Sequence, residues 1–311
     1  MLYFIVNLKS KTGGALENWR SIRKRLDEKK IKYTAYETKY EGHAKKLASK
    51  ICEINDDDKI IITLGGDGTI NEVINGITGF DRVRLAIIPS GSGNDFVKGH
   101  LLPSSQDEAL SYIMERCLTD DYSAADIGRV SFDNTERLFS ISSGLGLDAI
   151  VCKKALSSKL KKFLNLLHLG NMTYILLTVI SLFTMDTSDF EITYLCENGR
   201  KMTISLNKVI FAAAMNLPFE GGGVPMAPDA RSDNALLTLT CAHGIKKHST
   251  FFKLPRLAAG RHANIKGFDI VPAKKITVHT SKPNVLHADG EYLGDVTDVT
   301  FEILPGKLRL L

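Results

Sequence analysis

The chain has 311 residues, of which 44% are hydrophobic and 24% charged, a composition that excludes disordered and fibrous classes. Single cores stop growing near ~250–300 residues, so this length predicts two domains. The formal net charge of +5 is too small for a dedicated nucleic-acid binder, but it suits weak attraction to anionic lipid or nucleotide phosphates.

The cysteines indicate a reducing compartment. The five cysteines are scattered, and none forms a CxxC pair, which argues against a disulfide framework or a zinc site. The opening residues, MLYFIVNLKS, lack a basic leader and have too short an apolar run for a signal peptide. We therefore expect a first β-strand and a cytoplasmic protein.

Short apolar runs alternate with amphipathic patterns through the first third, which predicts a parallel sheet with crossover helices. We expect strands at residues 2–7, 32–37, 59–64 and 84–88, and helices at 17–30, 43–53, 70–76 and 107–116. After about residue 120, short alternating strands are expected at 126–130, 137–142, 189–195, 201–207, 209–214, 235–241, 275–280 and 299–304. Helices there are confined to 148–185 and 246–260, so the fold class is α/β followed by a β-rich domain.

One long apolar stretch, residues 163–185, needs to be weighed as a membrane span. A transmembrane helix needs about 20 consecutive apolar residues. Polar residues and a glycine interrupt the first half, at Asn165, His168, Gly170 and Asn171. The pattern therefore favours a buried or lipid-facing helix pair over a span.

The strongest motif is the strand–turn–helix KIIITLGGDGTINEVINGI, residues 59–77. Its glycines let the backbone approach a ligand closely, and free N–H groups at the helix start can bind phosphate. Asp67 can neutralise or ligate a phosphate-bound cation, because Mg²⁺ is usually held by few carboxylates plus phosphate oxygens. A tight βα turn without a ligand is the alternative, which the paired glycines together with Asp67 and Thr69 disfavour.

Two more glycine-rich loops follow predicted strands. LAIIPSGSGNDFVKG, residues 85–99, delivers a second loop to the carboxyl edge of the sheet, where ligands of open α/β sheets bind. SKTGG, residues 10–14, follows the first strand and is weak by itself. Three such loops after three strands predict a nucleotide site.

In combination, these motifs resemble the catalytic-domain family of diacylglycerol kinases, which sphingosine kinases, ceramide kinases and bacterial lipid kinases share. NAD kinases and phosphofructokinases are similar through the GGDGT-type loop only. The matching segments are NLKSKTG at 7–13 (Leu8 replacing a proline), Thr38 with His43 and Ala44, GGDGTINEVING at 65–76, PSGSGNDF at 89–96, SSGLGLDA at 142–149, NLPFEGGGVPMAPDA at 216–230 and HADGE at 287–291. The resemblance covers nearly the whole chain.

The resemblance implies a nucleotide-binding, three-layer α/β domain similar to NAD kinase and phosphofructokinase at residues 1–125. It implies a β-sandwich-like lipid-substrate domain at 126–311, whose final strand can return to the first domain. The implied activity is ATP- and Mg²⁺-dependent phosphorylation of a lipid hydroxyl, with diacylglycerol as the first expectation. The implied nucleotide-binding residues are Asn7, Ser10, Gly13, Gly14, Thr38, Gly65, Gly66, Asp67, Gly68, Thr69, Glu72, Ser92, Asn94 and Asp95.

Two late carboxylates, Asp289 and Glu291, are the implied catalytic pair, together with Asp67 in the glycine loop. By the resemblance, Asp289 would act as general base on the lipid hydroxyl, with Glu291 orienting it or serving as the base itself. From spacing alone, Asp-Gly at this position favours a type I′ hairpin turn. Only the resemblance reverses that interpretation.

The segment ARSDNALL, residues 230–237, departs from the family pattern. Bacterial members carry D-G-x-L here, and the Asp binds a structural Mg²⁺. Asn234 and Ala235 stand in place of that Asp-Gly, and Asp233 comes one residue early. An amide oxygen can ligate a cation but brings no charge, so Asp233 and Asn234 are expected to form a weak metal site. In the glycine loop, Ser92 replaces the family threonine and keeps the hydroxyl.

Basic residues lie next to apolar ones in two segments, 153–185 and 246–261, which suits reversible docking on anionic lipid. Solvated helix faces are an equal alternative for either segment alone. We expect a lipid substrate at a membrane surface, peripheral membrane contact, and possible homodimer formation. Other functions stay open: a kinase of another lipid alcohol (a sphingoid base or phosphatidylglycerol), an NAD kinase-like enzyme, and an inactive nucleotide- or lipid-sensing module. The GSGNDF loop disfavours the second, and the intact acidic residues disfavour the third.

Overall fold

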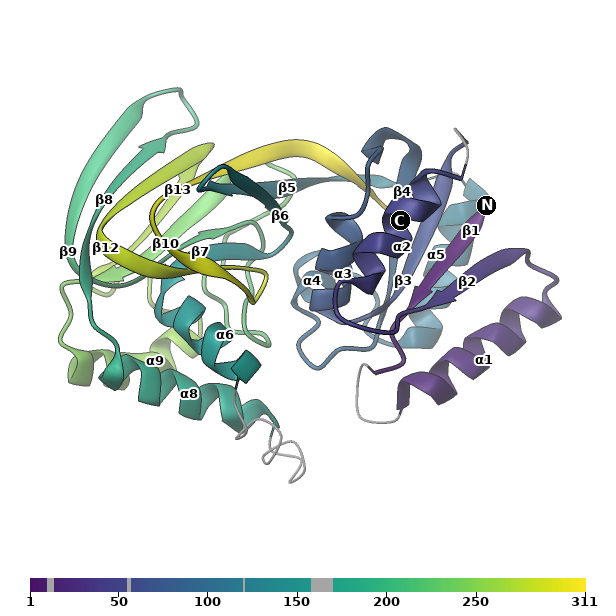
Figure 1. Ribbon diagram of the computed structural model, residues 1–311, viewed down its shortest axis with the longest axis horizontal. Helices are drawn as coiled ribbons and strands as arrows, with labels where there is room; N and C mark the ends of the chain where they lie inside the picture. The colour runs from purple at the N-terminus through teal and green to yellow at the C-terminus, as the bar shows by residue number, and fades with distance from the viewer. Residues whose placement is uncertain (10–13, 55–56, 120, 158–169) are drawn as a thin grey trace. The chain divides into compact units, whose positions relative to one another are not determined.

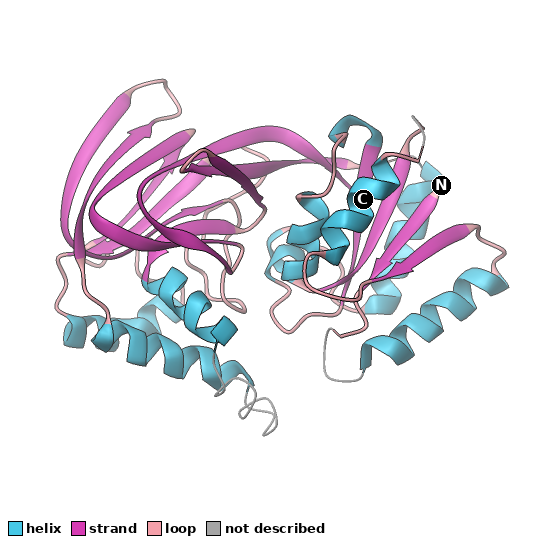
Figure 2. Cartoon of the chain, in the orientation of Figure 1, coloured by secondary structure: helices cyan, strands magenta, loops and turns pink. Residues whose placement is uncertain are grey.

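The computed structural model describes residues 1–9, 14–54, 57–119, 121–157 and 170–311 (Figures 1 and 2). The chain forms two compact units. The first contains residues 1–127 together with 305–311, and the second contains residues 128–304. Each unit has its own sheet region and its own buried core.

The first unit is built on a parallel sheet. Its strands are β1 (Leu2–Val6), β2 (Tyr33–Glu37), β3 (Lys59–Gly65), β4 (Val83–Pro89) and the end of β13 (Glu291–Leu310). Their order is β13-β4-β3-β1-β2, and every pair between neighbours in this order is parallel. Parallel strands are buried on both faces, and accordingly all seven residues of β3 are buried.

Helices cover both faces of this sheet. On one face, α1 (Gly14–Glu28) and α5 (Gln106–Thr119) pack on alternate residues of β1, β3 and β4. Trp19, Ile22 and Leu26 of α1 enter this core because their spacing of three and four residues places them on one side of a helix. On the other face, α2 (His43–Cys52) contacts β1, and α3 (Asp67–Ile74) contacts β3 (Figure 1).

Two short helices, η1 (Phe80–Arg82) and α4 (Asp95–Gly99), lie before and after β4. The α3 helix begins at Asp67, three residues earlier than the predicted start at Ile70. Gly66 precedes it in an extended conformation, and Asp67 places a negative charge in its first turn, where the helix dipole favours one. Gly68 therefore lies within α3 and does not prevent the helix from beginning at Asp67.

The second unit is antiparallel. Its strands are β5 (Ser123–Phe132, which begins in the first unit), β6 (Thr135–Phe139), β7 (Ser142–Gly146), β8 (Ser188–Leu195), β9 (Lys201–Met215), β10 (Leu237–His243), β11 (Phe268–Ala273), β12 (Lys275–Ala288) and the start of β13. The main order is β11-β10-β9-β7-β12-β13. The long strands β9 and β12 each pair with β8 over one half and with β7 over the other. The sequence predicted neither β7 nor β11 as a separate strand.

Two cores form in the second unit. One lies among the strands and includes Phe139, Phe190, Leu286 and Phe301. The other lies between the sheet and the helices α6 (Leu147–Ser157), α8 (Gly170–Thr184) and α9 (Lys247–Ala258). The predicted combination of an α/β unit and a β-rich unit is therefore observed.

The apolar stretch at 163–185 is only partly described. Residues 163–169 lie outside the described residues, and α8 accounts for 15 residues of the rest. Among the helices that the structure describes, none is both long and apolar enough to cross a membrane.

Candidate functional site

The carboxyl ends of four parallel strands in the first unit carry the predicted nucleotide residues. Asn7, Thr38, Gly66 and Ser90 each follow a strand directly. The amides of Asn7, Thr38 and Ser90 donate to Leu64, Val6 and Gly65 carbonyls on neighbouring strands, each at 2.9 Å. The ladder therefore continues one residue past the strands and fixes all four loop starts at one edge, where ligands of open α/β sheets bind.

The two main glycine loops touch each other at Gly66 and Gly91. A Cβ built on Gly66 would lie 2.9 Å from the Gly91 Cα, and one built on Gly91 would lie 2.6 Å from the Gly66 Cα. No side chain fits between backbones at this distance, so both residues must be glycine for the loops to meet. Gly68 differs, because a Cβ there would meet no atom within 4 Å.

Side chains cross between the loops and fasten them. The Asp67 Oδ1 accepts a hydrogen bond from the Phe96 amide at 3.1 Å, which joins the start of α3 to the start of α4. The Asn7 Nδ2 donates to the Thr69 Oγ1 at 2.9 Å, which joins the first loop to α3. These contacts bring together residues that are up to 62 positions apart in the chain.

Glu72 connects α3 to a third segment. Its two carboxylate oxygens accept the amides of Gly42 (2.8 Å) and Ala44 (3.0 Å), at the start of α2. The first N–H groups of a helix have no partner within the helix, so Glu72 caps α2 from outside. The predicted segment of Thr38, His43 and Ala44 is thereby held next to the GGDGT helix.

The second glycine loop has its own internal order. Asn94 adopts a left-handed conformation, with φ 53°, and its Oδ1 accepts the Gly91 amide at 3.0 Å. Asp95 is buried at the first position of α4, and Ser92 is exposed on the loop. Gly14 begins α1, whereas Ser10 and Gly13 lie outside the described residues.

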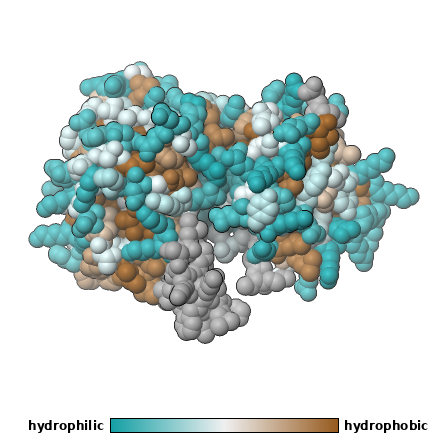
Figure 3. Space-filling view, in the orientation of Figure 1, coloured by the Kyte–Doolittle hydropathy of each residue, from teal (hydrophilic) through white to brown (hydrophobic). Residues whose placement is uncertain are grey.

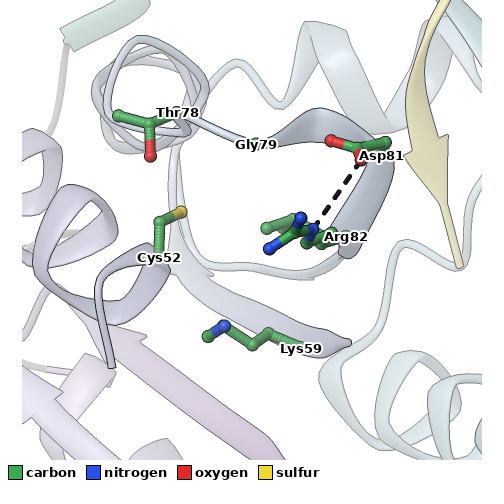
Figure 4. A pocket seen from close by; sticks show the side chains of 7 residues that line it. Cys52, Lys59, Thr78, Gly79, Asp81 and Arg82 are labelled. Atoms are coloured by element: carbon green, nitrogen blue, oxygen red, sulfur yellow. Dashed lines mark ion pairs between the residues drawn. The ribbon is translucent and has the colours of Figure 1, made fainter. Parts of the chain in front are cut away.

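A separate pocket in the first unit lies at the opposite ends of the strands. It is lined by Cys52, Lys59, Thr78, Gly79, Asp81, Arg82 and Val83 (Figure 4). Lys59 and Val83 are the first residues of β3 and β4, whereas the glycine loops follow the last residues of those strands. None of the predicted nucleotide residues lines this pocket, so it is not the nucleotide site proposed from the motifs.

In the second unit, Asp289 lies in the hairpin turn that joins β12 to β13. Asp289 and Gly290 have φ values of 45° and 82°, and Ala288 pairs with Glu291 across the turn. Positive φ at both central residues is the type I′ pattern that the spacing favoured. Asp289 is therefore a central residue of this hairpin turn.

The carboxylate of Asp289 is held by the segment just before β7. Its Oδ1 accepts the amides of Ile141 (2.8 Å) and Ser142 (3.0 Å), while its Oδ2 accepts the amide (2.8 Å) and hydroxyl (2.9 Å) of Ser140. Hydrogen bonds to an ionised acceptor are among the stronger ones. Four of them from one segment orient this carboxylate rigidly.

Glu291 is held by a different contact. Its Oε2 lies 2.5 Å from a terminal nitrogen of Arg137, and both side chains are largely shielded from solvent. Arg137 lies on β6, so the two acidic residues of the DGE motif are anchored to neighbouring parts of one antiparallel region.

A buried charge cluster lies beside Asp289. His287 is fully buried, and its Nε2 lies 3.1 Å from the Asp148 Oδ2 and 3.4 Å from the Glu220 Oε1. Burial alone would lower the pKa of His287, but the carboxylates of Glu220 and Asp148 outweigh it and raise the pKa to about 9. The Gly290 amide lies 3.4 Å from His287 Nδ1. A hydrogen bond this long is weak, so it does not prevent protonation of that nitrogen.

This cluster joins three of the motifs. Asp148 is the next-to-last residue of SSGLGLDA, Glu220 lies in NLPFEGGG, and His287 begins HADGE. Neither Glu220 nor His287 could be singled out within these motifs from the sequence, because only the fold brings them together. Their ligand atoms and those of Asp148 lie within 4.8 Å of one another. Mg²⁺ prefers oxygen ligands, and one of the three groups is an imidazole nitrogen, so the cluster does not fit Mg²⁺.

Asp233 and Asn234, the candidates for a weak metal site, have other contacts. The Asp233 carboxylate accepts two hydrogen bonds from Arg231, at 2.9 and 2.8 Å. The Asn234 Oδ1 accepts the Leu236 amide at 3.1 Å. Ala235 adopts φ 60°, the left-handed conformation that suits the glycine of the family pattern.

Family models match both parts of the chain. The diacylglycerol kinase catalytic domain matches residues 1–130, and the YegS C-terminal NAD kinase beta sandwich-like domain matches residues 141–311. The second match alone covers more than half of the chain. Both agree with the resemblance drawn from the motifs and with the predicted fold class, which are thereby confirmed.

Individual proteins are similar over most of their length. The candidate lipid kinase YtlR of Bacillus subtilis (strain 168) is 30% identical over 312 residues, covering 99% of this chain and 98% of YtlR. A diacylglycerol kinase of Staphylococcus saprophyticus is 29% identical over 273 residues, covering 87% of this chain and 82% of that protein.

Solved structures share the fold. A diacylglycerol kinase from Bacillus anthracis aligns with a TM-score of 0.72 at 24% identity, covering 99% of this chain and 96% of that one. An NAD kinase from Archaeoglobus fulgidus, solved in complex with ATP, aligns with a TM-score of 0.51 at 12% identity, covering 100% of this chain and 92% of that one. At these identities the likeness concerns the fold alone.

Proposed function

This chain is a lipid kinase of the diacylglycerol kinase catalytic-domain family, and on that premise we propose that it transfers the terminal phosphoryl group of ATP to the hydroxyl of diacylglycerol. The observation that carries the proposal is the meeting of two glycine loops at one sheet edge, with an open space above Gly68. Backbone N–H groups at the start of α3 and in the second loop are suitable donors to phosphate oxygens.

In this proposal, the first unit binds the nucleotide. Gly66 and Gly91 let the two loops approach closely, and Asn7 and Asp67 fasten them. Ser92 is exposed on the second loop and offers a hydroxyl to the phosphates. Asp67 would help to hold a phosphate-bound Mg²⁺, which would neutralise the charge that develops during transfer.

The second unit supplies the base. Asp289 is the preferred candidate, because four hydrogen bonds orient its carboxylate and leave no rotational freedom to be lost during the reaction. It would accept the proton of the lipid hydroxyl as that oxygen bonds to the terminal phosphorus and the bond from this phosphorus to the ADP oxygen breaks. The Ser140 hydroxyl, which can rotate, would release Oδ2 to receive the proton. Glu291, paired with Arg137, would orient Asp289 or take the proton in its place.

The substrate of the proposed reaction determines the cellular location that we propose for the protein. Diacylglycerol is insoluble in water and resides in membranes, so we propose a cytoplasmic protein in reversible, peripheral contact with the bilayer. Another lipid alcohol, such as a sphingoid base or phosphatidylglycerol, would need the same chemistry at the hydroxyl.

The test is a phosphorylation assay with labelled ATP, Mg²⁺ and mixed micelles that contain diacylglycerol, a sphingoid base or phosphatidylglycerol. We expect labelled phosphatidic acid, formed only with ATP and Mg²⁺ present. Label in another lipid would change the substrate, and label in NAD added to a parallel sample would support the NAD kinase-like alternative. ATP binding without any labelled product would favour the sensing module.

A further inference from the structure

Two helices of the second unit expose large apolar side chains side by side. On α8, Leu176, Ile180 and Phe183 are exposed by 43%, 41% and 49%. On α9, Phe251 and Phe252 are exposed by 40% and 76%. We refer to these five residues as the apolar face. Large contiguous apolar patches are unusual on soluble monomers and mark interaction sites.

The members of the apolar face are contiguous. Residues 176, 180 and 183 follow one another at spacings of four and three, which places them on one side of α8. Phe183 then contacts Phe251 of the other helix, with ring centroids 6.2 Å apart. Phe251 and Phe252 contact each other at 5.5 Å. Apolar side chains also gather over this part of the surface in the space-filling view (Figure 3).

The face does not result from a poorly packed helix. Leu177 and Leu182 on the other side of α8, and Met185 directly after the helix, are buried by at least 94% in the core under the helices. The α8 helix is therefore fully anchored on one side while it exposes apolar residues on the other. The buried side chains of α8 already anchor the helix, so the exposed side chains on its outer side have no structural role in the described part of the unit.

Charges around the apolar face have one dominant sign. The α8 segment from 170 to 184 carries no charged residue, and α9 carries Lys247, Lys253 and Arg256 without any acid. Arg256 lies four residues after Phe252 and so on the same side of α9. Lys246 is exposed just before the helix, while Asp186 after α8 is the nearest acid in sequence. Apolar residues flanked by cations are typical of helices that lie in a membrane interface.

We propose that the apolar face of α8 and α9 docks on a bilayer that contains anionic lipid, with its apolar side chains entering the interface and its cations binding head groups. The inference rests on the proposed function, because a diacylglycerol kinase must meet its substrate at a lipid surface. Charge complementarity favours this occupant: each cation near an anionic surface adds about 1 kcal/mol of attraction.

One lysine serves another purpose. The Lys247 ammonium donates to the carbonyl of Met185, at the end of α8, and so fastens the two helices to each other. A test of docking should therefore leave Lys247 unchanged. Lys246, Lys253 and Arg256 are the cations to neutralise.

The test compares binding of the full chain to sedimented vesicles of phosphatidylcholine with and without phosphatidylglycerol. We expect Ile180→Ser with Phe252→Ser to lower the partition coefficient on anionic vesicles about tenfold or more, because two exposed apolar side chains can then no longer enter the interface. Lys246→Gln with Lys253→Gln and Arg256→Gln should lower it several-fold and remove its dependence on salt. Leu118→Ser, on α5 of the first unit and 89% exposed, is the matched control and should bind as the wild type does.

Two further measurements separate docking from catalysis. ATP affinity in calorimetry and turnover of a dispersed short-chain diacylglycerol should be unchanged in all variants. Vesicle binding that persists in Ile180→Ser with Phe252→Ser would overturn the proposal, as would a wild-type dimer that this variant converts to a monomer in light scattering. If the wild type binds vesicles through this face but phosphorylates no lipid, docking stands and the proposed function fails.

Discussion

The glycine loops of the first unit and the charged cluster beside Asp289 in the second unit differ in how much space they leave for a ligand. In the first unit, the glycine loops follow consecutive strands and leave space, with an open position at Gly68. In the second unit, Asp148, Glu220, His287 and Asp289 come from distant segments and are packed with little access to solvent. The first region leaves space for a ligand, whereas the second is filled by its own charged side chains and the groups that bind them.

The largest expected effect is on Asp289, where chemistry and anchoring coincide. Asp289→Ala should lower turnover of diacylglycerol by at least about 10³-fold, as for removal of a positioned general base. ATP affinity should not change, because the nucleotide residues lie in the other unit. The measurements are turnover in mixed micelles and ATP titration by calorimetry.

Asp298→Ala is the matched control for this change. Asp298 lies on β13, which follows the turn that contains Asp289, but it is exposed and pairs with His279 at 2.8 Å, so turnover should stay at the wild-type level. If Asp289→Ala turns over lipid normally, the base lies elsewhere, and Glu291 becomes the first alternative.

The next effect concerns the buried charges around His287. His287→Gln should lower the free energy of unfolding by about 3–5 kcal/mol, because it leaves two shielded carboxylates without their cation. Urea denaturation at pH 7 measures this change. A loss below 1 kcal/mol would show that solvent or another cation balances the charge of the two carboxylates. The contrast between an open site in the first unit and a closely packed one in the second would then be wrong.

His287 also predicts how stability depends on pH. Its pKa is raised from 6.5 to about 9 in the fold, so its contribution is fully present below pH 6.5 and is lost as pH rises to about 9. The contribution is on the order of 3 kcal/mol. The difference in urea midpoint between wild type and His287→Gln should therefore shrink between pH 6.5 and 9.5. A difference that stays constant over this range would contradict the assignment.

A smaller and more selective effect is expected in the first unit. Gly68→Val should lower ATP affinity about 100-fold or more, because the new side chain occupies the space next to the phosphate-binding amides. The melting temperature should stay near the wild-type value, since nothing lies within 4 Å of a Cβ there. Gly66→Val is the contrasting variant, because its Cβ would meet the Gly91 backbone and should destabilise the loops as well. Unchanged ATP affinity in a folded Gly68→Val protein would remove the nucleotide assignment.

The smallest effect is expected at Asp233. This side chain and its partner Arg231 are both more than half exposed, and water and salt screen the attraction between such groups. Asp233→Asn should shift the melting temperature by less than about 2 °C. A chelator should leave the melting temperature equally unchanged while it abolishes turnover. A chelator-induced loss of stability that Asp233→Asn reproduces would instead identify a structural metal there.

The sequence predicted the fold class because its signals were local. Strand–loop–helix repeats in the first unit and alternating strands in the second can be recognised from neighbouring residues. The start of α3 was placed too late, at Ile70, since the helix-breaking tendency of glycine concealed that Asp67 and Gly68 already belong to the helix.

The contacts of the candidate site were harder to predict. Glu72 was expected at the nucleotide, yet both of its oxygens cap α2, an arrangement that depends on two helices packing on the same sheet face. The cluster of His287 with Asp148 and Glu220 spans separations of up to 139 positions, and no periodicity in the chain relates them. The exposure of Phe252 likewise follows from how α9 packs, which composition does not reveal.

The last residues of the first unit are synthesised long after the others. Leu310 pairs with Leu85 of β4, Leu311 enters the core under α1 and α5, and the Gly306 amide donates to Asp126 at 2.7 Å. At about 5–20 residues per second, a ribosome needs roughly 10–35 s to add residues 128–304 before these contacts can form.

During that interval, β4 is an unprotected sheet edge. Unpaired N–H and C=O groups on a long apolar edge strand invite pairing with other chains. The nascent first unit is thus exposed to aggregation for a period that the synthesis of the second unit sets. Refolding of the full-length chain from urea, where residues 305–311 are present from the start, avoids this delay altogether.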